Sequence, residues 1–562
     1  MPGIHPNFIQ DAPQTSNLFE CDLILKSYFQ HVMPREIWTA VAPQLSRFGE
    51  RCAGEIAALG LQAESQPPQH VPYDAWGRRI DHIKVCPAWE CLHEISAEEG
   101  LVAIGYERRE GEYSRLYQFA KLFLFHPSSA FYSCPLAMTD GAARVIELFG
   151  SARLKAGAFV HLTSRDPKKF WTSGQWMTEK TGGSDVSGTS TIAQKDGGGF
   201  RLFGDKWFTS ATTSRLTMAL AKVEGATDSR EGLSLFALEL RDAAGNLDHI
   251  RVNRLKDKLG TKALPTAELT LEGVPAEMIG GVGEGVKRVS SILNITRLYN
   301  SVTALAAMAH ALQLAKDYSG RRTAFGRKLM EHPLHVTTLA RLQVEYEGCF
   351  VLGFHLLHLL GREETGRASG EAREEESAIL RLLTPVIKLW TAKQCLLTVS
   401  EVIECFGGSG YIEDTGIPRL LRDAQVFSIW EGTTNVLSLD VLRALAKDQA
   451  LEPYFKLVES RLAKVSDARL SGEVTQVRQA ISELGKQSQT SADQQEAQAR
   501  DFAFALARTY AASLLLELAS QPGGDGLRRE RMRLVSQQFC RLPLAQFTGA
   551  SQPDDLRKIL SI

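Results

Sequence analysis

Apolar residues recur at helical spacing through most of the first 170 positions. Trp89, Leu92 and Ile95 fall on one face of a helix, and residues 117–124 repeat the spacing. This pattern predicts that the chain begins with a helical domain.

Between residues 176 and 280 the pattern changes to short apolar and β-branched runs. Glycine, aspartate and asparagine separate these runs, and residues 197–199 and 245–246 supply the residue types that tight turns prefer. The candidate strands are residues 189–194, 200–203, 217–223, 233–240 and 267–271. An isolated β block of this size predicts a small barrel or sandwich.

Helical periodicity returns near Val286 and continues to about Leu445, followed by a separate helical region. The charged stretch from Gly361 to Glu376 is interpreted as a solvated loop between helices. The predicted fold is therefore mainly α, with a central β-barrel domain between helical domains and an extra C-terminal helical domain. The expected domains are residues 1–172, 173–282, 283–445 and 446–562.

Composition places the chain among ordinary globular proteins. Its 562 residues are too many for a single core, and 44% are apolar and 23% charged. The net charge of -1 gives no strong attraction to nucleic acid or membranes. Nine scattered cysteines, with no CxxC spacing between Cys86 and Cys91, favour reduced thiols over disulfides or a metal site. Without a targeting segment or an apolar run of about 20 residues, we expect a cytoplasmic protein with no membrane span.

Five motifs stand in a fixed order along the chain. Each one alone is explained by a turn or a packed helix end. The motifs are residues 176–185, 206–210, 322–326, 407–411 and 430–433. In this order they resemble the flavin-dependent acyl-CoA dehydrogenase family over residues 130 to 445. Lys180, the Lys206-Trp207-Phe208 run and the long C-terminal extension are most similar to the AidB-type (adaptive response) branch.

The resemblance implies that FAD is bound beside the β region. Thr178 is expected to hydrogen-bond the flavin ring, next to Met177 and Gly183, and Ser184 to lie where the CoA moiety enters. Without the resemblance, these residues would be interpreted as a glycine-containing turn.

A second part of the flavin site is implied at residues 206–210. The resemblance places Phe208 against the flavin face and Ser210 near N5, the atom that accepts hydride. Family members often have Trp and Thr at these positions, so stacking by Phe208 would be weaker. An aromatic residue at a strand end is otherwise usually part of the core.

Arg322 and Phe325 match residues that reach the pyrophosphate and adenine of an FAD held mainly by a neighbouring subunit. A guanidinium suits bidentate contact with phosphate, whereas an exposed Arg alone would only be solubilising. The resemblance therefore implies a homo-oligomer, a dimer or tetramer. Ala324 departs from the family pattern, which often has a hydroxyl there.

Gly407 and Gly408 follow a predicted helix and would be a glycine helix stop in any protein. The resemblance adds contact with the adenosine part of FAD. Glu404 stands where Gln is common, and a carboxylate near pyrophosphate would turn away or pair with a cation. Thr433 and Asn435 fall at further FAD-contacting positions, although Asn435 is shorter than the usual Gln.

Glu431 is the candidate catalytic base. Removing the α-proton of a thioester requires a carboxylate in a largely apolar pocket, where loss of hydration strengthens it as a base. The β-hydride would pass to flavin N5. The backbone N–H of Glu431 and a ribityl hydroxyl would polarise the thioester oxygen, and Gly432 and Thr296 border this acyl-CoA site. A lone Glu between Trp and Gly is otherwise usually an exposed loop residue.

Three function classes remain open. The first is an active FAD-dependent acyl-CoA dehydrogenase, and the second is a low-turnover FAD protein that binds long-chain acyl-CoA. The third is a DNA-associated AidB-like flavoprotein, suggested by arginines 528, 529, 531, 533 and 541. Residues 446–562 carry 16 Lys+Arg against 14 Asp+Glu, an excess of only 2 that favours a solvated face over nucleic-acid binding. The motifs do not specify the acyl chain length or the electron acceptor.

Overall fold

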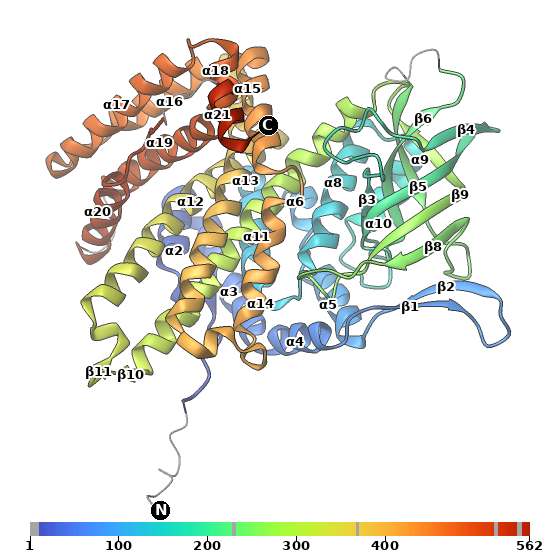
Figure 1. Cartoon of the computed structure of the whole chain (residues 1–562), viewed down its shortest axis with the longest axis horizontal. Coiled ribbons are helices and arrows are strands. Elements are labelled where there is room, and N and C mark those ends of the chain that lie inside the picture. The colour runs from blue at the N-terminus through green and yellow to red at the C-terminus, as the bar shows by residue number, and fades with distance from the viewer. Residues whose placement is uncertain (1–9, 227–231, 367–369, 522–525, 548–552, 562) are drawn as a thin grey trace, which may run out of the picture.

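The computed structural model describes residues 10–226, 232–366, 370–521, 526–547 and 553–561. Figure 1 shows a central helical body, a β-barrel on one side of it and a group of C-terminal helices on the other. The predicted fold class, mainly α with a central β-barrel domain and extra C-terminal helices, is confirmed.

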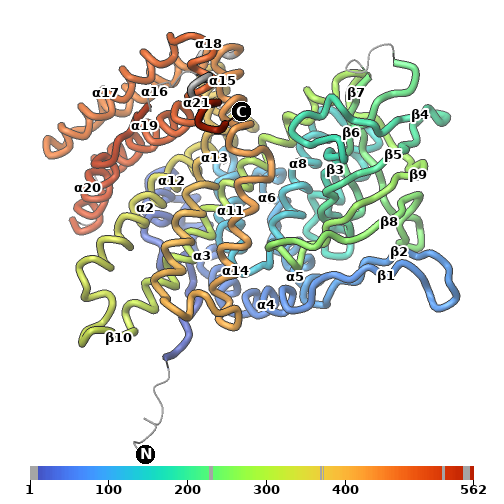
Figure 2. The backbone as a smooth tube through the Cα atoms, viewed as in Figure 1, coloured from blue at the N-terminus to red at the C-terminus, as the bar shows by residue number. Residues whose placement is uncertain are grey.

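The N-terminal region is helical apart from one hairpin. Its helices are α1 (Leu18–Cys21), α2 (Leu23–Val32), α3 (Arg35–Arg51), α4 (Ala57–Ser65), α5 (Pro87–Glu98), α6 (Ala103–Glu107), α7 (Ser114–Phe125), α8 (Ser133–Phe149), α9 (Ala152–Ala156) and α10 (Ala158–Leu162). Strands β1 (Gln69–Tyr73) and β2 (Arg79–Lys84) form a hairpin that runs below the barrel in Figure 2. Arg79 anchors it by donating to the carbonyl of Val252. Helical spacing did not predict this hairpin, because its strands are short and mostly polar.

The β domain contains β3 (Ser173–Trp176), β4 (Ile192–Asp196), β5 (Gly199–Ser210), β6 (Leu216–Val223), β7 (Leu233–Glu239), β8 (Ile250–Leu255) and β9 (Thr266–Ile279). β6 pairs with β7, β7 with β9, β9 with β5, β5 with β4, and β4 with β6, so the sheet closes on itself as a barrel. Closure leaves β4, β5, β6, β7 and β9 without a free edge, while β3 and β8 each pair on one side only, with β6 and β9. The register of β5 and β9 places Ser210 opposite Thr266.

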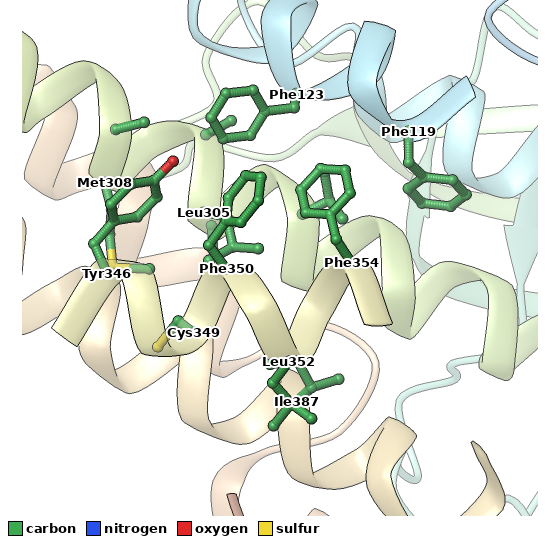
Figure 3. Packing of buried hydrophobic residues seen from close by; sticks show 14 of the residues in the cluster. Phe119, Phe123, Leu305, Met308, Tyr346, Cys349, Phe350, Leu352, Phe354 and Ile387 are labelled. Carbon is green, nitrogen blue, oxygen red and sulfur yellow. The ribbon is translucent and has the colours of Figure 1, made fainter. Parts of the chain in front are cut away.

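The helical body is built from long helices. They are α11 (Gly285–Arg321), α12 (Pro333–Thr365), α13 (Gly370–Cys405), α14 (Ile417–Ala424) and α15 (Thr434–Asp448), and a two-residue pair of strands, β10 (Thr323–Ala324) and β11 (Arg327–Lys328), joins α11 to α12. Aromatic and aliphatic side chains fill the space between α7 and these helices. Figure 3 shows part of this core, including Phe119, Phe123, Leu305, Met308, Phe350, Phe354 and Ile387.

The charged stretch from Gly361 to Glu376 is not a solvated loop, and that prediction is wrong. α12 continues to Thr365 and α13 begins at Gly370. Glu364 is buried, where it pairs with Arg115 at 2.7 Å. Arg115 also pairs with the buried Asp140 at 2.9 Å. A carboxylate that finds a buried partner on another helix is retained in the core, whatever the polarity of its neighbours in sequence.

The C-terminal extension packs α16 (Leu451–Leu462), α17 (Ser471–Gln487), α18 (Ala492–Ala497), α19 (Ala499–Ala519), α20 (Gly526–Cys540) and α21 (Pro553–Leu560) beside the body. Phe539 lies against Gly348, which leaves no room for a Cβ atom. Over the residues described, α19 is the one helix long and apolar enough to cross a membrane. However, 78% of its most apolar stretch is buried inside the protein, as in a core helix.

Two arginines of the C-terminal cluster have carboxylate partners within the chain. Arg531 pairs with the buried Glu347, and Arg533 pairs with Glu530. Arg508 similarly pairs with Glu345 at 2.7 Å. These side chains attach or organise the extension, so their positive charge is largely neutralised by this chain.

Candidate functional site

Glu431 lies in the loop between α14 and α15, on a strained backbone. Its φ is 58° and that of Gly432 is 110°, both in the region that favours glycine. The side chain of Glu431 is half-buried. Thr296, buried on α11, donates its hydroxyl hydrogen to Oε2 of Glu431 at 2.6 Å. A non-glycine residue in this conformation persists only where surrounding contacts hold it.

Two cations hold the backbone of this loop. Arg297 donates to the carbonyl of Glu431 at 3.3 Å and pairs with Asp440 at 2.7 Å. Lys388, fully buried on α13, donates to the carbonyl of Gly432 at 2.6 Å. Burial lowers the pKa of Lys388 to about 7, although the nearby Glu431 carboxylate raises it. Sequence reasoning missed Lys388; its signal was a charged residue inside the apolar run of residues 386–390.

The loop after β3 contains Met177, Thr178, Gly183 and Ser184. Met177 is buried, Thr178 is half-buried, and Gly183 and Ser184 are exposed. A Cβ atom on Gly183 would lie 2.7 Å from the Thr178 hydroxyl oxygen, so this turn requires a glycine or a shift of Thr178. The carbonyl of Thr178 accepts a hydrogen bond from the N–H of Trp207 at 3.0 Å, which ties the loop to β5.

A buried ion pair that the motifs did not reveal fixes the same loop. Glu179 accepts from the Lys206 ammonium at 2.8 Å. Burial alone would raise the pKa of the Glu179 carboxyl, but the Lys206 charge and hydrogen bonds from Lys206, Ser190 and Thr191 lower it to about 2. Glu179 is therefore ionised throughout the physiological pH range.

Phe208 and Ser210 lie at the end of β5. The Phe208 ring is 56% exposed, which is unusual for an aromatic residue on a barrel strand, and the Lys256 ammonium lies 4.8 Å from its centroid. Ser210 is buried, and its hydroxyl oxygen lies 3.0 Å from that of Thr266. An exposed aromatic ring two residues from a buried hydroxyl on the same strand fits a flat isoalloxazine ring.

The remaining candidate residues lie elsewhere on the helical body. Arg322 precedes β10, and Phe325 sits in the β10–β11 turn with 95% of its surface exposed. Glu404, Gly407 and Gly408 are exposed at the end of α13. Figure 1 places the β10–β11 turn at the end of the body away from the barrel.

The C-terminal ends of α11 and α13 meet through an aromatic contact. The ring centroids of Tyr318, on α11, and Phe406, which follows α13, lie 4.7 Å apart. Thr433 precedes the first turn of α15 and Asn435 lies within it, both exposed. Figure 1 thus places the β10–β11 turn, which carries Phe325, away from β5, which carries Phe208 and Ser210.

Comparison with known proteins covers nearly the whole chain. Residues 10–166 match the adaptive response protein AidB N-terminal domain and residues 174–274 the acyl-CoA dehydrogenase middle domain. Residues 283–446 match the acyl-CoA dehydrogenase C-terminal domain and residues 449–557 the acyl-CoA dehydrogenase 11 C-terminal domain-like family.

Individual relatives agree with these matches. The chain is 46% identical over 533 residues to acyl-CoA dehydrogenase family member 11 of Caenorhabditis elegans, covering 91% of this chain and 86% of the relative. It is 32% identical over 402 residues to the putative acyl-CoA dehydrogenase AidB of Escherichia coli, covering 70% and 72%. The crystal structure of C. elegans ACDH-11 in complex with C11-CoA superposes with a TM-score of 0.95 at 42% identity, covering 100% of this chain and 98% of that one.

The resemblance inferred from the five motifs is thereby confirmed. The chain belongs to the acyl-CoA dehydrogenase family of FAD-dependent oxidoreductases, in its AidB-like branch.

Proposed function

We propose that the protein oxidises the Cα–Cβ bond of an acyl-CoA thioester, with Glu431 as the base. Glu431 would take the α-proton, and FAD, when bound, accepts the β-hydride, so the products are a 2-enoyl thioester, a protonated Glu431 and reduced FAD. The single observation that carries the proposal is the Glu431 carboxylate, which the Thr296 hydroxyl holds at 2.6 Å in a positive-φ loop.

The residues around Glu431 support this role physically. Thr296 stabilises the carboxylate in one orientation, and Arg297 and Lys388 fix the two carbonyls that follow it in the loop. With these carbonyls held, the two peptide planes that follow the Glu431 side chain are fixed, which keeps the carboxylate in place in the loop. Orientation of this kind supplies much of the rate gain in enzymes.

We further propose that FAD lies between chains of a homo-oligomer. Met177, Thr178, Phe208 and Ser210 would hold the flavin ring against the barrel. The candidate adenine and pyrophosphate residues Arg322, Phe325, Glu404, Gly407 and Gly408 would act on the FAD of a second copy. The exposed Phe325 ring, on the end of the body away from the barrel, supports a partner at that position.

An anaerobic titration of the purified flavoprotein tests the proposal. Acyl-CoAs of graded length, C11-CoA among them, should bleach the flavin absorbance of the wild type. Glu431→Gln should bind the same ligands but bleach at least about a thousandfold more slowly, since removal of the base forfeits general base catalysis. Glu496→Gln, an exposed carboxylate of the extension, is the matched control and should behave as wild type.

The alternatives give different outcomes in the same titration. Tight acyl-CoA binding with no bleaching at any chain length would support a low-turnover binding protein instead. Bleaching retained in Glu431→Gln would remove Glu431 from its role. DNA association predicts a salt-dependent mobility shift, but the carboxylate partners of Arg531 and Arg533 weigh against it.

A further inference from the structure

A half-buried lysine lies on the barrel side of the site. Lys258 belongs to the loop between β8 and β9, and its ammonium has three acceptors within the chain. They are the carbonyls of Thr261 and Leu264, both at 2.6 Å, and the hydroxyl oxygen of Thr266 at 3.3 Å. An ammonium has three hydrogens and no acceptor, so this arrangement uses all of its donors.

Thr266 connects this ammonium to Ser210. The two hydroxyl oxygens lie 3.0 Å apart, across the paired strands β5 and β9. Lys258 can only donate, so Thr266 accepts from it, and the Thr266 and Ser210 hydroxyls share a further hydrogen bond in which either oxygen can be the donor. The Lys258 ammonium thus holds the Thr266 hydroxyl in place beside Ser210, at the start of a chain of hydrogen bonds.

The charges of Lys258 and Glu431 both affect the pKa of the Cys134 thiol. Burial raises the pKa of the Cys134 thiol to about 12, while the Lys258 charge lowers it and the Glu431 charge raises it. The ammonium therefore lies within electrostatic reach of the candidate active site. Burial lowers the pKa of Lys258 itself to about 8, against the raising effects of Cys134, Glu64 and Asp423.

We propose that Lys258 is a positioning residue that acts through Thr266 to hold the Ser210 hydroxyl beside the flavin, and that its charge makes the flavin easier to reduce. Reduction by two electrons and one proton adds one negative charge to the cofactor, and a nearby cation stabilises that charge. This inference rests on the proposed placement of FAD beside Ser210, but not on Glu431 or on turnover.

The test is a measurement of the midpoint potential of the bound flavin with a chemical reductant and reference dyes. Lys258→Met should make the potential more negative by about 30 mV or more, which is a tenfold loss in the two-electron equilibrium. Lys258→Arg keeps the charge and should restore most of this shift. Lys262→Met, an exposed lysine of the same loop, is the matched control and should leave the potential unchanged.

Two further variants separate the charge from the hydrogen bonds. Thr266→Val keeps the ammonium but breaks the connection, so it should shift the potential in the same direction by less and also alter the flavin absorbance spectrum. Equal potentials in the Lys258→Met and Lys262→Met proteins would overturn the charge role. An unchanged potential and spectrum in Thr266→Val would overturn the connection through the hydroxyl.

The pH dependence gives an independent check. Lys258 is cationic below about pH 8 and neutral above it, so the gap between wild type and Lys258→Met should be full at pH 6.5 and close at higher pH, about 9.5. Glu64, whose pKa burial raises to about 7, also changes charge near this loop, and Asp423 and Arg419 face it. The Lys258→Met protein retains these groups, so subtracting its profile isolates the lysine. A gap independent of pH would contradict the assignment.

The outcomes remain separable from those of the proposed function. A purified protein that cannot bind FAD would refute the flavin site as a whole, before any potential is measured. A protein that binds FAD and bleaches with acyl-CoA, yet shows no effect of Lys258→Met, would refute only the role of Lys258.

Discussion

Replacing Lys206 with methionine breaks the buried ion pair that fixes the loop after Thr178. Lys206 is fully buried and donates to Glu179 at 2.8 Å and to the carbonyl of Leu220 at 2.9 Å. Methionine is close to lysine in shape, so the change removes the charge with little change in packing. The Glu179 carboxylate, 3% exposed, is then left in the barrel wall without its counterion.

The expected loss follows from the remaining partners of Glu179. Breaking a buried ion pair typically costs about 3–5 kcal/mol. Ser190 and Thr191 still donate from their N–H groups and hydroxyls, at 2.6–3.2 Å, so the lower end of about 3 kcal/mol applies. The Lys206 charge and its hydrogen bond are among the causes that lower the pKa of Glu179 to about 2, which agrees in direction with this loss.

The pKa of Lys206 indicates that burial of the pair has a cost as well. The pKa of Lys206 is lowered, because burial of its charge outweighs the attraction of Glu179. The pair as a whole therefore adds little net stability, since the desolvation of the two ions offsets their attraction. Replacing both residues with methionine should then cost much less than the two single changes together.

Urea unfolding, followed by the fluorescence of the buried Trp176 in the barrel, measures this cycle. Lys206→Met and Glu179→Met should each lower the free energy of unfolding, and the double variant should recover part of the loss. Lys195→Met, exposed on a neighbouring strand, should lie within about 0.5 kcal/mol of wild type. A coupling energy below about 0.5 kcal/mol between Lys206 and Glu179 would refute the reasoning.

The free energy of unfolding at acid pH tests the same ion pair. The folded pKa of Glu179 is lower than the unfolded one, so its contribution is complete above about pH 4.5 and is lost as the pH falls toward 2. The difference in stability between wild type and Lys206→Met should therefore narrow below about pH 4.5. A difference that widens in acid would contradict the assignment of Glu179 as the stabilised charge.

Three other substitutions test the loop and the extension. Lys388→Met should slow flavin bleaching about tenfold or more by releasing the Gly432 carbonyl. Between about pH 7 and 10.5 the lysine is protonated only in the unfolded chain, so the stability of the wild type should rise with pH, and Lys388→Met should rise less. An equal rise in both proteins would contradict the lowered pKa of Lys388. Thr296→Val should slow bleaching by about tenfold or more with acyl-CoA affinity retained, since it removes a bond to the Glu431 carboxylate, and equal rates would exclude that bond from catalysis. Arg531→Met leaves the buried Glu347 carboxylate without its cation, so a protease should cleave the extension at a lower urea concentration than in the wild type. Identical cleavage would show that this ion pair does not anchor the extension.

Much of the architecture could be predicted because its determinants are local. Alternation of short apolar runs with turn residues located β4 to β7 and β9, and helical spacing located α11 and α13. The order of the motifs singled out Glu431, and the structure places its carboxylate on Thr296, which the resemblance also named. Local patterns missed the polar strands of the β1–β2 hairpin and β8, and they misplaced the charged stretch of residues 361–376.

The sequence by itself determined the fold class, the family and the candidate base, because periodicity, turn residues and motif order depend only on the order of residues in the chain. The tertiary structure alone decided which partners the buried charges have: the pairing of Lys206 with Glu179, and of Lys388 with the Gly432 carbonyl, depends on the fold. Glu364 was mistaken for part of a solvated loop, since its partner Arg115 is 249 residues away. Burial of a charge depends on a counter-charge or carbonyl brought from a distant element, and no local window of sequence contains that partner.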